Sequence, residues 1–170
     1  MTRDAATPDG AAFAPGAELR LEVQDLLDGY VTCLDDFDLE AWPEFFTDDC
    51  FYQIIPRENW DRGLPLATVR CESKGMLKDR VAAVREMQLF APRYVRHLLS
   101  AVRIVGVEDG VIDARANYCV LQTLVDEETK VFQSGRYIDR IVRQDGRLKF
   151  KEKSCVFDSV TVPTSLVYPI

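Results

Sequence analysis

The stretch Leu26–Gln53, LLDGYVTCLDDFDLEAWPEFFTDDCFYQ, passes from the apolar spacing of a helix to that of a strand. Its first part predicts one apolar helix face, formed by Leu26, Leu27, Tyr30, Val31 and Leu34. Asp38 is expected to N-cap a second short helix, which carries an aromatic wedge of Trp42, Phe45 and Phe46. We expect Thr47–Asp49 to end that helix and a strand to follow over Phe51–Ile55. This order predicts helices, from Glu18 to about Phe46, that pack against a sheet.

The rest of the chain predicts one further helix and a series of long strands. The helix runs from Ser73 to about Met87, after a loop over Arg57–Pro65 and a strand over Leu66–Arg70, and buries Met76, Leu77, Val81 and Val84. The long strands are Arg96–Glu108, Val111–Val125, Thr129–Arg143 and Leu148–Ser159, with turns at Asp109-Gly110 and Asp145-Gly146. Helices first and a long antiparallel meander afterwards predict the α+β class.

Length, charge and composition favour a single soluble domain. The 170 residues suit one domain over 18–170, after a flexible N-terminal arm over 1–17 that is rich in small residues, Pro and Gly. A net charge of −7 disfavours nucleic acid as a partner. We expect no signal peptide and no membrane partner, since no apolar run approaches the ~18 residues of a span. Five widely spaced cysteines without a C-x-x-C pair favour reduced thiols and a cytoplasmic location.

Metal chemistry has little support in the sequence. His97 is the only histidine, whereas a facial-triad iron site needs two His and a carboxylate, and a Rieske centre needs two Cys and two His. We therefore expect no metal and no cofactor bound by this chain alone. The acidic run Asp35-Asp36-Phe37-Asp38 offers oxygens to a hard cation but lacks a calcium-loop spacing, so a helix end followed by an N-cap is preferred.

Three later stretches carry a resemblance to a known family. Tyr94–Ile104, YVRHLLSAVRI, resembles the R-H-x-x-S-x-V-R-V segment of the small (β) subunits of aromatic ring-hydroxylating dioxygenases. Gly135–Asp139, GRYID, is similar to their G-x-Y/R-x-D strand, and Lys153–Asp158, KSCVFD, is similar to their terminal R-x-x-x-x-D, with Lys153 where Arg is usual. With the opening motif, the resemblance covers about Leu26 to the end of the sequence. Trp42–Tyr52, Gly63-Leu64 and Met76–Arg80 resemble subunits of terephthalate, salicylate and anthranilate enzymes most.

The resemblance implies a fold, a role and partners. The fold is the NTF2-like (SnoaL-like) cone, in which N-terminal helices pack on a curved antiparallel sheet. The role is that of a non-catalytic, structural small subunit in an α3β3 or α2β2-type assembly. There the large subunit carries a Rieske [2Fe–2S] cluster and mononuclear Fe(II), and a separate reductase delivers electrons from NADH for O2 insertion. We expect a homotrimer of this chain within an α3β3 hetero-hexamer.

A different class of function stays open at this point. Pocket enzymes of the same fold, such as dehydratases, isomerases and cyclases, use a His–carboxylate pair as general acid and base, and His97 with Asp35, Asp36 or Asp139 would supply one. An open cone lined by such a pair would favour the pocket enzyme. A cone filled by Trp42, Phe45 and Phe46 would favour the structural subunit. A plain ligand-binding module is a third alternative.

Two further features suggest contacts with partners. Trp60 is a large aromatic residue in a polar loop, where it serves either as an interface anchor or in local packing. The apolar tail Val160–Ile170 is expected to be buried against the sheet or a neighbouring subunit, so Leu166, Val167, Tyr168 and Ile170 are interface candidates. The alternating run Arg147, Lys149, Lys151 and Lys153 is interpreted as the polar face of a strand, solvated or facing a partner, rather than an anion site.

Overall fold

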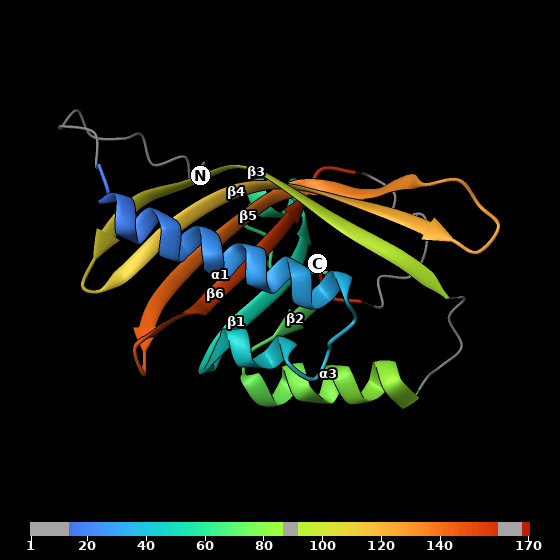
Figure 1. Cartoon of the computed structure of the whole chain (residues 1–170), viewed down its shortest axis with the longest axis horizontal. Helices are drawn as coiled ribbons and strands as arrows, with labels where there is room; N and C mark the ends of the chain where they lie inside the picture. The colour runs from blue at the N-terminus through green and yellow to red at the C-terminus, as the bar shows by residue number, and fades with distance from the viewer. Residues whose placement is uncertain (1–13, 87–91, 160–167) are drawn as a thin grey trace.

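The fold is described from a computed structural model, for residues 14–86, 92–159 and 168–170 (Figure 1). Within these ranges the helices are α1 (Ala17–Asp35), a 3-10 turn η1 (Trp42–Phe45), α2 (Arg57–Asp61) and α3 (Lys74–Glu86). The strands are β1 (Phe46–Pro56), β2 (Val69–Cys71), β3 (Arg93–Glu108), β4 (Val111–Leu124), β5 (Lys130–Gln144) and β6 (Arg147–Phe157). The expected arm over 1–17 lies mostly outside the described residues, and Ala17 already belongs to α1.

The described strands form one curved sheet in the order β2-β1-β6-β5-β4-β3, and α1 lies across its inner face (Figure 1). The α+β class and the four long strands are confirmed. Two predicted turns are confirmed as well: Asp109-Gly110 and Asp145-Gly146 have positive φ at both residues, as a two-residue hairpin turn requires. The expectation of a purely antiparallel sheet is wrong for one pair, because β1 runs parallel to β6.

The predicted apolar face of α1 is the face that covers the sheet. Leu27, Tyr30, Val31 and Leu34 are buried there, and Leu26 is packed at its edge. The helix ends at Asp35, and the chain reverses at Phe37, which has a φ of +56°. The main-chain N–H of Asp38 then donates to the carbonyl oxygen of Cys33 at 3.0 Å. The helix therefore ends in a local turn within the predicted acidic run.

The wedge differs in detail from the prediction. It is a 3-10 turn whose N-cap is Ala41, without a side-chain capping bond, so the prediction of Asp38 as the N-cap is wrong. The chain becomes extended at Phe46, and Thr47–Asp49 belongs to β1 rather than to a break before it. Pro43 lies in the first turn of this element and favours its short form, because proline fixes φ and lacks an N–H.

The segment between β1 and β3 also departs from expectation. The predicted loop Arg57–Pro65 contains α2, and the short strand after it is β2, which begins three residues and ends one residue later than predicted. In α3, Leu77 and Val81 are buried and Val84 is partly buried, but Met76 is 42% exposed, so its predicted burial is wrong. Met87 lies outside the described residues.

A β-bulge in β6 changes which side chains face the core. Ile141 of β5 lies opposite Phe150, while its neighbour Arg140 lies opposite Glu152, so Lys151 has no partner on β5. Each extra residue reverses the alternation of side chains between the two faces of a strand. Lys153 therefore faces the inside, with Cys155 and Phe157, and is fully buried. The prediction that Lys153 continues an outer polar face is wrong.

Candidate functional site

His97 and Asp35 form a buried pair between β3 and the last residue of α1. The ring Nδ1 of His97 lies 2.6 Å from Asp35 Oδ1, and the His97 main-chain N–H donates to both carboxylate oxygens at 3.1 Å. The His97 side chain is 1% exposed and that of Asp35 is 12% exposed. Arg96 lies 3.9 Å from the same carboxylate at the surface. This pair joins the end of α1 to the sheet.

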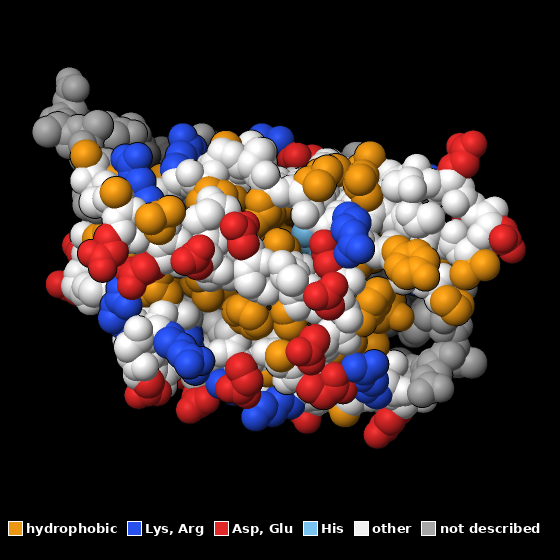
Figure 2. Space-filling view, in the orientation of Figure 1, with side chains coloured by type: hydrophobic (Ala, Val, Ile, Leu, Met, Phe, Trp, Pro, Cys, Tyr) orange, Lys and Arg blue, Asp and Glu red, His pale blue; other side chains and the backbone are white. Residues whose placement is uncertain are grey.

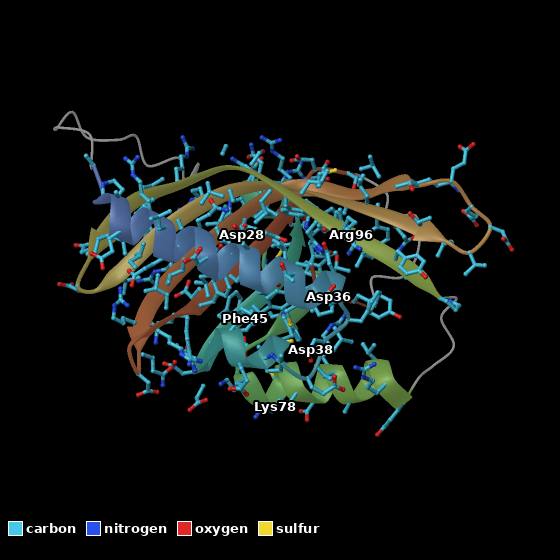
Figure 3. All side chains as sticks on the ribbon, in the orientation of Figure 1. Asp28, Asp36, Asp38, Phe45, Lys78 and Arg96 are labelled. Carbon is cyan, nitrogen blue, oxygen red and sulfur yellow. The ribbon has the colours of Figure 1, made fainter. Side chains whose placement is uncertain are left out.

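The other two candidate carboxylates do not reach His97. Asp36 is exposed just beyond the end of α1, where Figure 3 labels it. Asp139 points into the core from β5 and pairs with Lys153. Of the combinations considered from the sequence, the structure therefore brings together only His97 with Asp35. The second imidazole nitrogen, Nε2, has no hydrogen-bond partner among the described residues.

Lys153 lies in an aromatic cage at the centre of the molecule. Its Nζ is 3.2 Å from Asp139 Oδ2, and the two side chains are 0% and 1% exposed. The same ammonium lies over the rings of Tyr137, Phe150 and Tyr30, at 3.5, 4.5 and 4.6 Å from their centroids. Burial raises the pKa of Asp139, and Lys153 opposes that rise. The ammonium is thus held by one carboxylate and by ring faces.

Sequence reasoning missed this buried pair, although a signal for it exists. Leu148 and Phe150 are apolar at one phase of the strand, whereas Cys155 and Phe157 are apolar at the opposite phase. Lys153 shares the second phase, so the change of phase marks both the bulge and the burial of the lysine.

The interior of the cone is filled with side chains. Trp42, Phe46 and Tyr52 are fully buried and pack edge to face, with ring centroids 5.3 to 5.8 Å apart. Phe45, which Figure 3 shows beneath α1, packs edge-on against Tyr30 at 5.9 Å. Beside His97 there is a cavity of about 20 Å³, closed in part by Tyr168, Pro169 and Ile170. Such a cavity has space for about one water molecule.

The described residues offer no metal site, and three of the buried thiols are not activated. They contain no group of three or more His, Cys, Asp or Glu side chains placed to hold a metal ion. Burial raises the pKa of the Cys33 and Cys50 thiols to about 11 and that of Cys155 to about 12, so these thiols stay protonated at neutral pH. In the same ranges, no helix is long and apolar enough to span a membrane.

The outer face of β3, β4 and β5 combines exposed apolar residues with arginines. Exposed apolar side chains there are Tyr94 (73%), Leu98 (54%) and Val131 (61%). Arg103 lies directly opposite Arg115, and within the described ranges neither of them makes an ion pair. Like charges directly opposite each other destabilise a sheet unless a partner compensates them. By contrast, acidic and basic side chains are interspersed on the α1 face (Figure 2).

The residues proposed from the sequence as interface anchors occupy different environments. Trp60 is half-buried in α2, on the side of β1 and β6. Tyr168 is half-buried and packs edge-on against Phe37, with a centroid distance of 5.2 Å. Ile170 is 2% exposed within its own subunit, which matches burial against the sheet, one of the two expected environments. Leu166 and Val167 lie outside the described residues.

Comparisons with known proteins agree on one family. Residues 16–154 match the family model of the SnoaL-like domain. The chain is 42% identical over 149 residues to the anthranilate 1,2-dioxygenase small subunit of Burkholderia cepacia, a match that covers 88% of this chain and 92% of that protein. It is 34% identical to the beta 2 subunit of the terephthalate 1,2-dioxygenase terminal oxygenase component of a Comamonas species, over 83% and 92% of the two chains. A Novosphingobium aromaticivorans structure, assigned as the beta subunit of an aromatic-ring-hydroxylating dioxygenase, superposes with a TM-score of 0.82 and 41% identity over 90% and 97%.

Proposed function

The chain belongs to the SnoaL-like family and, within it, to the small subunits of aromatic ring-hydroxylating dioxygenases, and from this membership we propose that it serves a Rieske oxygenase that acts on a carboxylated aromatic ring. Its role is structural: it supports the large subunit, which carries the [2Fe–2S] cluster and the mononuclear Fe(II). The reaction is NADH-dependent hydroxylation of the ring with O2, in the cytoplasm. The carboxylated substrate rests on the relatives, which are named for anthranilate and terephthalate.

The filled interior is the structural observation that carries the scaffold role. Pockets for drug-sized ligands typically have volumes of about 300–1,000 Å³. The cavity beside His97 measures about 20 Å³, and the aromatic wedge occupies the space beneath α1. The rival hypothesis of a dehydratase, isomerase or cyclase needs an open cone lined by His97 and a carboxylate. The pair exists, but the cavity that the described residues leave beside it is too small for a substrate, so the rival is not favoured.

The described residues also do not fit the iron groups of the family. His97 is the only imidazole in the chain, and Asp35 already occupies its Nδ1. The carboxylate of Asp139, which is almost completely buried, is paired with Lys153. Both iron groups and the redox chemistry therefore belong to the large subunit in the proposed complex.

The outer face of β3, β4 and β5 is the surface through which the proposed homotrimer would associate. We propose that this face, with Tyr94, Leu98 and Val131 exposed, packs on a neighbouring copy of the chain. Burial of these side chains would remove an apolar patch from water, and carboxylates of the acidic neighbour would compensate Arg103 and Arg115. Closed cyclic symmetry would cover the same patch on every copy, and three copies fit the expected α3β3 hexamer. Trp60 and Tyr168 remain candidates for further contacts.

A surface variant tests this association. Leu98→Asp adds a charge to the apolar patch and should convert the trimer to monomers, measured by light scattering against the 19.3 kDa mass of one chain. Leu21→Asp is the matched control, because Leu21 is also exposed (65%) but lies on α1. A Leu98→Asp chain that is folded and still trimeric would contradict the proposed interface.

Co-purification tests the function itself. The chain is produced alone and together with a large subunit from the same genome that carries the C-x-H and C-x-x-H signature. Iron content, visible absorption, mass, and NADH-dependent hydroxylation of anthranilate and terephthalate with a reductase are measured. We expect iron and turnover only in the complex. Stoichiometric iron or Rieske-type absorption in the chain alone would contradict the scaffold role.

A further inference from the structure

The apolar interior of the cone contains a polar cradle that the scaffold role does not use. Tyr30 from α1, Tyr52 from β1 and Cys155 from β6 are each fully buried, and their polar atoms converge on a single oxygen. That oxygen is a main-chain oxygen of Ile170. Tyr30 Oη donates to it at 2.7 Å, Cys155 Sγ at 3.1 Å and Tyr52 Oη at 3.3 Å.

The segment Tyr168–Ile170, here the tail segment, is held like a bound ligand. The Ile170 N–H donates to Tyr52 Oη at 3.0 Å, so both main-chain polar groups of this residue have partners inside the cone. Its side chain lies in the apolar core and is almost completely buried. At the entrance, Tyr168 packs edge-on against Phe37, and the Arg93 guanidinium lies 5.4 Å from the Tyr168 ring centroid. The tail segment is thus held by contacts of the Tyr168 ring at the entrance of the cone and by hydrogen bonds of Ile170 inside it.

The cradle offers hydrogen-bond donors to an acceptor oxygen of a carbonyl or carboxylate group. Burial raises the pKa of Tyr30 and Tyr52 well above the usual range, so both remain protonated hydroxyl donors. Buried hydroxyl groups without partners are unfavourable, and the tail segment supplies the acceptor that satisfies them. The Trp42 and Tyr52 side chains also lie beside the Tyr30 hydroxyl, but the acceptor of its hydrogen bond at 2.7 Å is the Ile170 oxygen. The cradle is therefore complete only when an oxygen occupies this position.

We propose that the interior of the cone is a binding site for a carbonyl or carboxylate oxygen on a small branched apolar group, and that the tail segment is its resident ligand. The site continues into the cavity beside His97, whose buried Nε2 has no partner within the described ranges. Removal of the tail segment opens the cradle and joins it to that cavity. A molecule of the same chemistry then binds in its place.

Trans-complementation tests the proposal. A chain that stops after Val167 should melt at a lower temperature than the full chain, and the peptide acetyl-Tyr-Pro-Ile should restore the melting temperature in a saturable manner. In this shortened chain, Tyr30→Phe should weaken the peptide about five-fold, which corresponds to the loss of one hydrogen bond of ~1 kcal/mol. Tyr118→Phe is the matched control, because its hydroxyl is buried but donates to Gln133 at 2.8 Å. The proposal would be overturned if the shortened chain folds but its melting temperature does not change with millimolar peptide. It would also be overturned if both substitutions weaken peptide binding equally.

A measurement on the full chain covers the case in which the shortened chain does not fold. The exchange of the Ile170 amide hydrogen is followed in the full-length protein by NMR. Tyr52→Phe removes its acceptor and should accelerate this exchange at least about ten-fold, whereas Tyr118→Phe should leave it within about two-fold. Unchanged exchange in Tyr52→Phe would show that the cradle does not hold the tail segment, and would overturn the proposal.

Discussion

Replacement of Lys153 by Met should destabilise the protein strongly, because it leaves a buried carboxylate without its cation. Lys153 and Asp139 are almost completely buried and are 3.2 Å apart. Methionine keeps most of the length and volume of the lysine side chain, so the change removes the charge and leaves little cavity. Removal of one partner of a buried ion pair costs about 3–5 kcal/mol of unfolding free energy. The rings of Tyr137, Tyr30 and Phe150 lose their cation in the same step.

The double variant separates the buried charge from the packing. Asp139→Asn in the Lys153→Met background removes the orphaned charge, so the two changes together should cost less than the sum of the single changes. We expect an interaction energy of at least about 1 kcal/mol in that direction. An additive result would mean that the two side chains do not depend on each other in the folded state.

The pH dependence gives a second signature of the same pair. Burial raises the pKa of Asp139, and Lys153 lowers it, so Lys153→Met raises it further. A carboxyl group with a raised folded-state pKa contributes stability that is present below its unfolded pKa of about 3.9 and is lost as the pH rises through the folded pKa. The free energy of unfolding of the variant should therefore fall furthest below that of the wild type at about pH 7.5, and the difference should become smaller towards about pH 5.

Urea unfolding followed by circular dichroism measures these effects. Protein concentration must be held constant, because the stability of an oligomer depends on it. The slope of free energy against urea should be unchanged, which shows that the same surface is exposed on unfolding. A Lys153→Met cost below about 1 kcal/mol, or a gap that widens towards acid pH, would refute the buried charged pair.

Three other substitutions or modifications test separate parts of the structure. Gly135→Ala would drive its Cβ into the main-chain oxygen of Val156 in β6, so it should lower the free energy of unfolding by at least about 2 kcal/mol. Gly106→Ala is the control: its Cβ meets no atom within 4 Å, and urea unfolding should give a change within about 0.5 kcal/mol. His97→Gln removes the ring contact with Asp35 and should cost about 1–3 kcal/mol while turnover of the complex is retained; lost turnover in a complex of unchanged mass would favour a catalytic role. Cys155, with its pKa raised to about 12, should resist a thiol reagent in the native chain at about pH 8 and react only on unfolding.

The parts of the fold that could be predicted depend on local sequence. The apolar face of α1 follows from helical spacing, and the turns at Asp109-Gly110 and Asp145-Gly146 follow from residues that tolerate positive φ. The wedge was found because Trp42 and its aromatic neighbours are close in sequence. Each of these signals is complete within about ten residues, so no knowledge of the rest of the chain is needed.

The missed features depend on residues far apart in sequence. β1 and β6 pair in parallel although about 100 residues separate them, and no pattern within either strand specifies that direction. The change of apolar phase along β6 hints at the bulge, but its position at Lys151 follows only from the pairing of β6 with its neighbours β5 and β1. The sequence offers His97 three candidate carboxylates. Which of them it contacts depends on the residue at which α1 ends, and that residue is Asp35. Element boundaries are the least certain part of such predictions, and here one residue decides the partner.

The pair of His97 and Asp35 shows why a catalytic constellation does not by itself make an enzyme. General acid–base work requires the free imidazole nitrogen to reach a substrate proton, at about 2.6–3.2 Å or through one water. Here Nδ1 is hydrogen-bonded to Asp35, and the cavity beside His97 measures only about 20 Å³. The same carboxylate also accepts the main-chain N–H of His97, so it fixes the strand as well as the ring. A contact that binds backbone and side chain together at the junction of helix and sheet is suited to holding the cone rigid, and a rigid cone is what a supporting subunit must present to its partner.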